Sequence, residues 1–172
     1  NNIKLKIIGD GPEKKNLKDL AKRLSLTKNV KLKIIGDGPE KKNLKNLAKK
    51  LNLTKNVKFY GYKTDIEKYL LKTHLYINSS YFEGFPNSVV EAANLGVPII
   101  SSQSHGGINE ILLKGKCGTI YNSGYKNLAF EIEKFLKNPE IFYKKVKLAK
   151  KNVSRFNLQS HKKNFEKLLN KI

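Results

Sequence analysis

The chain has 172 residues, 39% of them hydrophobic, and a formal net charge of +21, which suits one basic domain with a core of ordinary size. No apolar run approaches the roughly 20 residues that a transmembrane helix needs, and the N-terminal segment lacks the apolar stretch of a signal peptide. The single Cys117 argues against a disulfide framework, so we expect a cytoplasmic protein.

The positive charge is carried almost entirely by lysine. Of the 35 basic residues only Arg23 and Arg155 are arginine, and the lysines are scattered rather than grouped in blocks. Arginine is the side chain that usually makes bidentate contacts to phosphates and bases. We therefore interpret the lysines as solvated surface and do not expect a nucleic-acid partner, whereas weak contact with the inner face of an anionic membrane stays open.

A tandem repeat opens the chain. Residues 4–30 and 31–57 align without gaps, and each copy contains a strand pattern, KLKII, then the turn GDGP and a helix pattern. The copies differ only at three pairs of positions: Asp19 and Asn46, Arg23 and Lys50, Ser25 and Asn52. Each copy is predicted to be a β-turn-α unit, and two copies followed by unrelated sequence do not predict a solenoid.

The second copy carries a helix signal with an apolar stripe. The stripe recurs at intervals of three and four residues: Leu44, Leu47, Ala48 and Leu51. Pro39 suits the first helical turn, and Glu40 suits the positive end of the helix dipole.

Strands and helices continue to alternate after the repeat. Strands are predicted at 57–60, 75–79, 97–101 and 119–121. Helices are predicted at 64–73, 87–95, 108–113, 125–137, 139–152 and 157–171, and TDIE at 64–67 is typical of a capping box. Six strand–helix alternations predict an α/β fold, a doubly wound (Rossmann-like) parallel sheet with helices on both faces.

The loops after the strands are the expected ligand site, because doubly wound folds bind ligands outside the carboxyl ends of their strands. Glycine-bearing loops follow four strands, at 36–38, 61–63, 83–87 and 104–107. Glycine lets the backbone come close to a ligand.

The stretch EGFPNSVVE at 83–91 places a carboxylate before and within the helix predicted at 87–95. The first N–H groups of that helix form an anion site, which Asn87 can cap, Pro86 orients and Gly84 leaves accessible. Glu91 lies one turn in and leans toward this site, where it can accept hydrogen bonds from a ribose, and Glu83 can accept from a second sugar. The pattern therefore predicts a nucleotide-sugar site. The alternative, a solvated Glu83 and a Glu91 that complements the helix dipole, has about equal weight from spacing alone.

Two linked segments resemble a known family. YFEGFPNSVVEAANLGVPIIS followed by GGINEIL, and LKIIGDGPEKKNLKNLA followed by VKFYGY, are similar to the C-terminal donor-binding domain of family 4 (group 1) glycosyltransferases of the GT-B fold. The resemblance covers residues 31–121. It implies retaining transfer from a UDP- or GDP-linked sugar to a glycan or lipid, with no cofactor and no bound metal.

The resemblance also implies roles for single residues. Glu83 would be the catalytic residue that contacts the donor sugar, and Glu91 would hold the ribose. The other positions that it implies in donor binding are Gly61, Tyr62, Lys63, Gly84, Phe85, Pro86, Asn87, Gly106 and Gly107. His105 and Glu110 lie in the same segments, and for both a role outside ligand contact is favoured.

The chain departs from the family at its N-terminal end. It reads as one nucleotide-sugar-binding domain over 1–172, with C-terminal helices at 125–172, and the acceptor domain is absent. A segment of the form GRLxxxKG, whose Arg and Lys neutralise the diphosphate in the family, is also absent, and the first repeat copy stands in its place. That copy brings Gly9–Gly11 there and either fills the vacant strand position or dangles; Lys14 and Lys15 are the candidate substitutes.

Three functions are compatible with these features. The first is the donor half of a retaining glycosyltransferase, inactive or incomplete as an isolated chain, and the absence of Met predicts a fragment, a processed chain or a trimmed chain. The second is a non-catalytic or degenerate nucleotide-sugar-binding module. The third is a basic protein that binds nucleic acid or a membrane surface.

Overall fold

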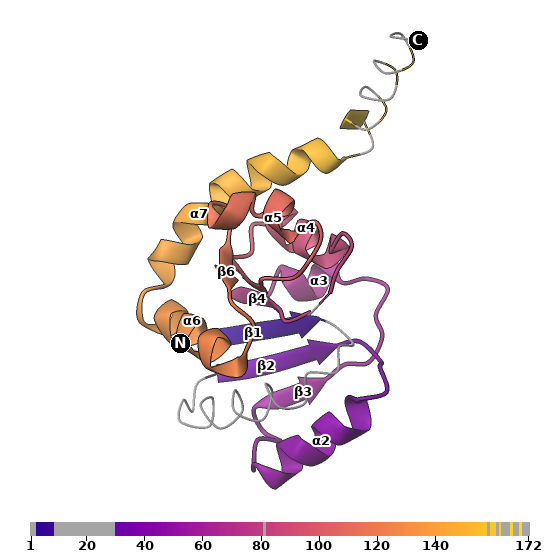
Figure 1. Cartoon of the computed structure of the whole chain (residues 1–172). Coiled ribbons are helices and arrows are strands. Elements are labelled where there is room, and N and C mark those ends of the chain that lie inside the picture. Colours follow the sequence, from indigo (N-terminus) through magenta and orange to yellow (C-terminus); the bar gives the residue numbers. More distant parts are fainter. Residues whose placement is uncertain are drawn as a thin grey trace.

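The computed structural model describes residues 3–8, 30–80, 82–157, 159–160, 162, 166 and 169. Its described strands form one parallel sheet in the order β3-β2-β1-β4-β5-β6 (Figure 1). The strands are β1 (Ile3–Ile8), β2 (Val30–Ile35), β3 (Val57–Phe59), β4 (Leu75–Asn78), β5 (Ile99–Ser102) and β6 (Thr119–Tyr121). The predicted doubly wound fold is confirmed, and the order reverses between β1 and β4, where such folds bind ligands.

Helices follow most strands, close to where their periodicity predicts them. The described helices are α2 (Lys41–Lys50), α3 (Glu67–Leu70), α4 (Asn87–Asn94), α5 (Ile108–Ile111), α6 (Tyr125–Lys137) and α7 (Pro139–Val153), with the 3-10 turns η1 (Leu113–Gly115) and η2 (Ser154–Phe156). Pro39 and Glu40 lie in the turn before α2 rather than in its first turn.

The repeat appears in the sheet as two neighbouring strands. Within β1, residues 4–8 each pair with their own equivalent in the second copy, from Lys4 with Lys31 to Ile8 with Ile35. On its other side β1 pairs with β4 (Figure 1). The strand of the first copy therefore lies inside the sheet, so the dangling alternative does not hold for this strand. The GDGP turn of that copy, its helix and both Lys14 and Lys15 lie outside the described residues.

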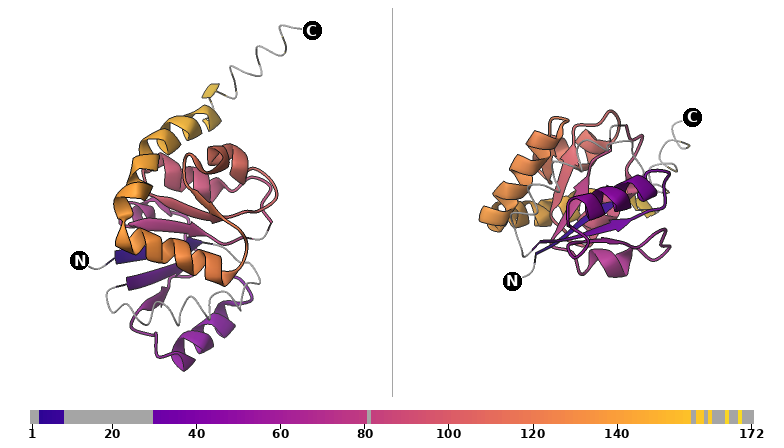
Figure 2. Two further views of the ribbon diagram at one scale, coloured as in Figure 1. Left: turned by 60° about the vertical axis from the view of Figure 1, so that its left-hand side comes forward. Right: turned by 90° about the horizontal axis from the view of Figure 1, so that it is seen from below.

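The core is divided between the two faces of the sheet, as a period of two requires. Leu75 and Ile77 point to the face that α6 covers, whereas Tyr76 between them points to the face of α4 and α5. Helix α7 joins the two layers, since Phe142 packs in the first cluster and Val153 in the second. Figure 2 shows α6 crossing one face of the sheet, and α7 continuing from the end of α6.

The start of α3 differs from the prediction. Its N-cap is Ile66, no side chain caps it, and it ends at Leu70 rather than at 73. Asp65 bonds the Lys68 ammonium at 3.0 Å instead of leaving the first turn to a Thr64–Glu67 capping box. The helix predicted at 157–171 lies mostly outside the described residues, and none of the helices in the described ranges is long and apolar enough to cross a membrane.

Candidate functional site

The loops after β2 and β3 are tied together at the carboxyl edge of the sheet. The Gly36 N–H donates to the Gly61 carbonyl at 3.0 Å, and Gly61 has a φ of +69°. The Asp37 carboxylate accepts from the Lys41 ammonium at 2.7 Å and from the backbone N–H of Tyr62. The Lys41 hydrogen bond lowers the pKa of Asp37 below its ordinary value.

The side chains of this loop pair differ in exposure. The Tyr62 side chain is 73% exposed, and Lys63 is half-buried. The Tyr62 side chain is therefore accessible to a ligand.

The loops after β4 and β5 are also joined to each other. The backbone of Phe82 pairs with that of His105, and the Glu83 N–H donates to the His105 carbonyl at 3.4 Å. The Gly107 N–H donates to the Gly84 carbonyl at 2.8 Å. The two segments that the sequence marks as donor-binding therefore form one unit, in which Glu83 is half-buried.

The glycines of this unit have two different surroundings. A Cβ at Gly106, where φ is +111°, would overlap the Glu83 carbonyl. A Cβ at Gly107 would stand 2.8 Å from Cδ2 of Phe85. At Gly84, by contrast, a Cβ would have no neighbour within 4 Å. Gly106 and Gly107 therefore permit the two loops to pack, and at Gly84 the space where a side chain would lie is open.

Helix α4 begins beside this open space. Its N-cap is the buried Pro86, whose carbonyl accepts the Val89 N–H at 3.0 Å. The prediction that Asn87 caps the helix is wrong: Asn87 is its first residue, exposed, with no side-chain cap hydrogen bond. Because Pro86 has no N–H and has its φ fixed, it starts the helix without a polar cap. The first helical N–H groups and the dipole then favour an anion here.

Tyr76, which the sequence did not single out, lies beneath this helix end. It is fully buried on β4 and donates a hydrogen bond to Oγ of Ser88 at 2.8 Å. Burial raises the pKa of the Tyr76 phenol far above its ordinary value, and the charges of Glu83 and Glu91 raise it further. Because successive side chains of a strand point to opposite faces, the strand LYIN predicts only that Tyr76 faces away from the side of Leu75 and Ile77.

A hollow of about 330 Å³ adjoins the exposed Glu91. It lies between α4 and the segment that enters α3, and its lining residues are Thr64, Asp65, Ile66, Glu67, Leu70, Glu91, Asn94 and Leu95. Cavities of roughly 300–1,000 Å³ are typical of small-molecule sites. A ligand group with hydroxyls in this hollow could donate hydrogen bonds to the Glu91 carboxylate.

The other candidates take no part in this arrangement. His105 is exposed and joins the unit through its backbone carbonyl. Glu110 forms an ion pair with the Arg155 guanidinium at 3.4 Å. Within the described ranges no group of three His, Cys, Asp or Glu side chains could hold a metal ion.

Comparison with protein families decides the assignment. The family model described as glycosyl transferases group 1 matches residues 23–153. The chain belongs to the group 1 glycosyltransferases. This group 1 chain is 43% identical over 111 residues to an uncharacterized glycosyltransferase of Methanocaldococcus jannaschii, a match that covers 64% of the chain and 21% of the relative.

Solved structures agree on the fold. The Anabaena protein HepE, crystallised with UDP, matches with a TM-score of 0.86 at 24% identity, covering 100% of this chain and 50% of that one. The C-terminal domain of a group 1 glycosyltransferase of Francisella tularensis matches with a TM-score of 0.76 at 18% identity, covering 91% and 87%. This group 1 chain therefore has the fold of a C-terminal GT-B domain and spans about a fifth of its curated relative and half of HepE.

Proposed function

We propose that this chain is the donor-binding half of a retaining glycosyltransferase and binds a nucleoside-diphosphate sugar at the carboxyl edge of its sheet. One observation carries the proposal. The space beside Gly84 is open and adjoins the N-terminal end of α4, with Glu83 in the loop before this helix and Glu91 one turn inside it. An anion site flanked by two carboxylates suits a diphosphate with a sugar on each side.

In this proposal each part of the donor has its own contacts. Glu83 positions the transferred sugar, and the N–H groups of Gly84, Phe85 and Asn87 bind the sugar and the diphosphate. Glu91 accepts from the ribose hydroxyls in the adjoining hollow. Stabilising the charge on the leaving diphosphate would be a large part of catalysis. The segment 61–63 would lie near the base.

The remaining elements of the proposal concern the acceptor and the membrane. A glycan or lipid acceptor would bind a second domain. Transfer would need the nucleotide-sugar donor as substrate and neither a cofactor nor a metal. The isolated chain would therefore transfer little or no sugar. We also propose that any membrane contact is peripheral and uses the basic surface.

Donor binding can be tested directly by isothermal titration with UDP and with GDP. UDP is the first choice because the Anabaena relative was crystallised with UDP and with UDP-glucose. We expect Glu91→Gln to weaken binding about tenfold, since a charged acceptor contributes about 1.5–3 kcal/mol to a hydrogen bond. Glu140→Gln on α7 is the matched control and should bind like the parent.

Two further results would decide between functions. A parent chain that binds neither nucleotide at low salt would overturn the proposal. Transfer that appears only when a separately made acceptor half is added would support the enzyme, whereas binding without transfer would favour a non-catalytic module. The anomeric configuration of the product, measured by NMR, tests retention.

A further inference from the structure

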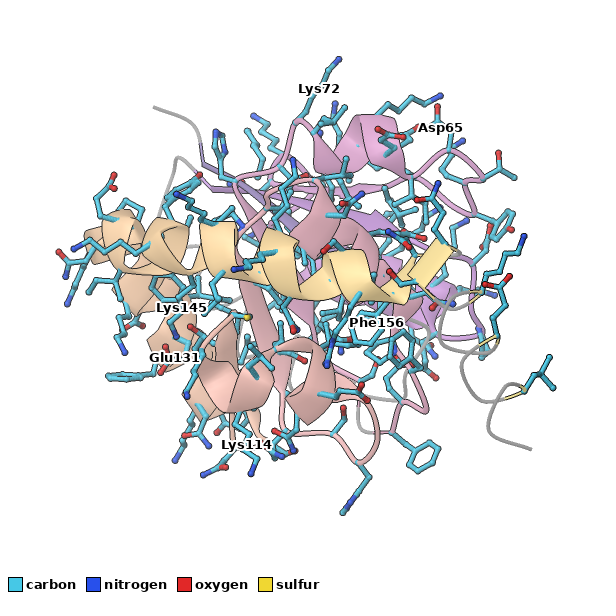
Figure 3. The ribbon with its side chains drawn as sticks, turned by 90° about the horizontal axis from the view of Figure 1, so that it is seen from above. Asp65, Lys72, Lys114, Glu131, Lys145 and Phe156 are labelled. Carbon is cyan, nitrogen blue, oxygen red and sulfur yellow. The ribbon has the colours of Figure 1, made fainter. Side chains whose placement is uncertain are left out.

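The loop 83–86, here called the donor loop, contacts η2, because Phe85 meets Phe156, 71 residues later in the sequence. The rings of Phe85 and Phe156 meet edge to face, with centroids 5.1 Å apart and an interplanar angle of 77°. Phe156 belongs to η2, directly after α7, and is half-buried. In Figure 3 Phe156 lies at the end of α7 that is away from Lys145 and Glu131.

Phe156 also contacts the residue before it. The Arg155 guanidinium stacks over the Phe156 ring, 4.6 Å from its centroid. Its Nη2 donates to the Glu110 carbonyl at 3.1 Å and lies 3.4 Å from the Glu110 carboxylate. Asn152, one turn earlier, donates through Nδ2 to the Ile111 carbonyl at 2.7 Å. The end of α7 and η2 are therefore fixed to the carbonyl end of α5.

These contacts close a ring of three segments. The first residue before α5, Gly107, donates its N–H to the Gly84 carbonyl at 2.8 Å, and a Cβ at this position would stand 2.8 Å from Cδ2 of Phe85. The chain of contacts begins at Phe85, which meets Phe156 in η2. Arg155 of η2 then contacts α5, and Gly107 before α5 returns to Gly84. Backbone hydrogen bonds join Glu83 and Gly84 to the loop after β5, whereas the 41% exposed Phe85 side chain connects the same loop to η2 through this ring contact. The aromatic pair therefore links the loop to η2, which those backbone bonds do not reach.

We propose that Phe156, clamped by Arg155, is a positioning residue for the donor loop 83–86 and sets where Glu83 and the Gly84 backbone stand. The proposal rests on the proposed donor binding for its effect on affinity. Its structural part concerns the loop alone. Because α7 leads into η2, a displacement of η2 would reach the donor loop through this aromatic pair and through the hydrogen bonds of Arg155 and Asn152 to α5.

The test compares two aromatic pairs of nearly equal geometry. Phe156→Leu removes the pair at the loop, and Phe142→Leu removes the pair between Phe142 and Phe135, with centroids 5.3 Å apart on the α6 face of the sheet. Amide hydrogen exchange of the ligand-free full chain is measured over 83–86 and over α6. We expect Phe156→Leu to speed exchange at 83–86 about two- to tenfold, as loss of an aromatic pair gives, and Phe142→Leu to leave 83–86 as in the parent.

Affinity gives the second readout. UDP should bind Phe156→Leu about two- to tenfold more weakly, with recovery in Phe156→Tyr, which keeps the ring. Equal exchange at 83–86 in the parent and Phe156→Leu would overturn the positioning role, as would the same acceleration in Phe142→Leu. A parent chain that does not bind UDP would instead overturn the donor-binding proposal, and the exchange measurement would still judge the loop contact.

Discussion

At Gly106 the place of a side chain is taken by the backbone of another loop. Its φ of +111° favours glycine, and a Cβ there would overlap the Glu83 carbonyl. The sequence indicated Gly106 as a donor contact through family resemblance, but its observed surroundings are protein. A glycine between two loops cannot be told from a glycine facing a ligand by sequence, because both positions only require the absence of Cβ.

Gly106→Ala tests this steric role. A positive φ costs an alanine about 1–2 kcal/mol, and the overlap with Glu83 should add about 1–3 kcal/mol, as overpacking does. Gly124→Ala is the control, because Gly124 has a φ of +119° but no atom within 4 Å of its Cβ position. Urea unfolding should show a larger loss of stability for Gly106→Ala. Equal losses for the two variants would contradict the loop packing described here.

The Asp37 carboxyl offers a test by pH. Its pKa lies below the ordinary 3.8 because Lys41 donates to it, so the stability from this pair is present above that value and lost as the pH falls through the lowered pKa. Lys41→Gln should raise the pKa of Asp37 toward 3.8, measured by NMR titration of the carboxyl carbon. Asp65, whose pKa is lowered by Lys68, should not respond. An unchanged Asp37 pKa would show that Lys41 is not its main partner.

At the scale of elements, periodicity predicted most of the fold. The bounds of α6 and β6 are those expected from the sequence, because each has a clear apolar pattern and a strong neighbouring turn. The ends of α3 and α4 were predicted less well. Thr64–Glu67 and Asn87 have the residue types of caps. Instead, the Lys68 N–H donates to the Asp65 carboxylate and the Val89 N–H to the Pro86 carbonyl. Such competition depends on tertiary neighbours, which a local pattern does not contain.

The sequence also did not predict which side chains contact residues of other elements. Tyr76 and Phe156 look like ordinary apolar positions, and only the packing of β4, α4 and η2 shows which groups they contact. In contrast, Glu83 and Glu91 could be proposed from a nine-residue pattern, because both lie near the end of one helix.

Helix α4 leads to a prediction about ligand charge. If its N-terminal end holds the diphosphate, UDP should bind more tightly than uridine by about two- to thirtyfold, which corresponds to about 0.3–2 kcal/mol from a helix end. The difference should shrink as salt rises, since exposed charges are screened. Calorimetry at two salt concentrations checks both points. Equal affinities for UDP and uridine would remove α4 from the proposed diphosphate contact.

For the whole molecule, the repeat matters most through the position of β1. The sheet order places β1 between β2 and β4. The donor loop follows β4, so the neighbour of β4 on this side comes from the duplicated unit. The sequence left open whether this copy enters the sheet, because identical strands predict pairing with equal force for either copy. The order reversal at β1 and β4 could not be inferred without the structure.

Deletion of residues 4–30 tests whether the first copy is part of the domain. The deletion removes an interior strand that pairs on both sides, with six residues facing β2 and three facing β4. We expect the shortened chain to lose its cooperative thermal unfolding, because β2 and β4 would each be left with an unpaired edge. The control keeps the length and makes the copies identical with Asp19→Asn, Arg23→Lys and Ser25→Asn, which leaves the strand sequence unchanged. A deleted chain that unfolds as cooperatively as this control would show that the fold does not need β1.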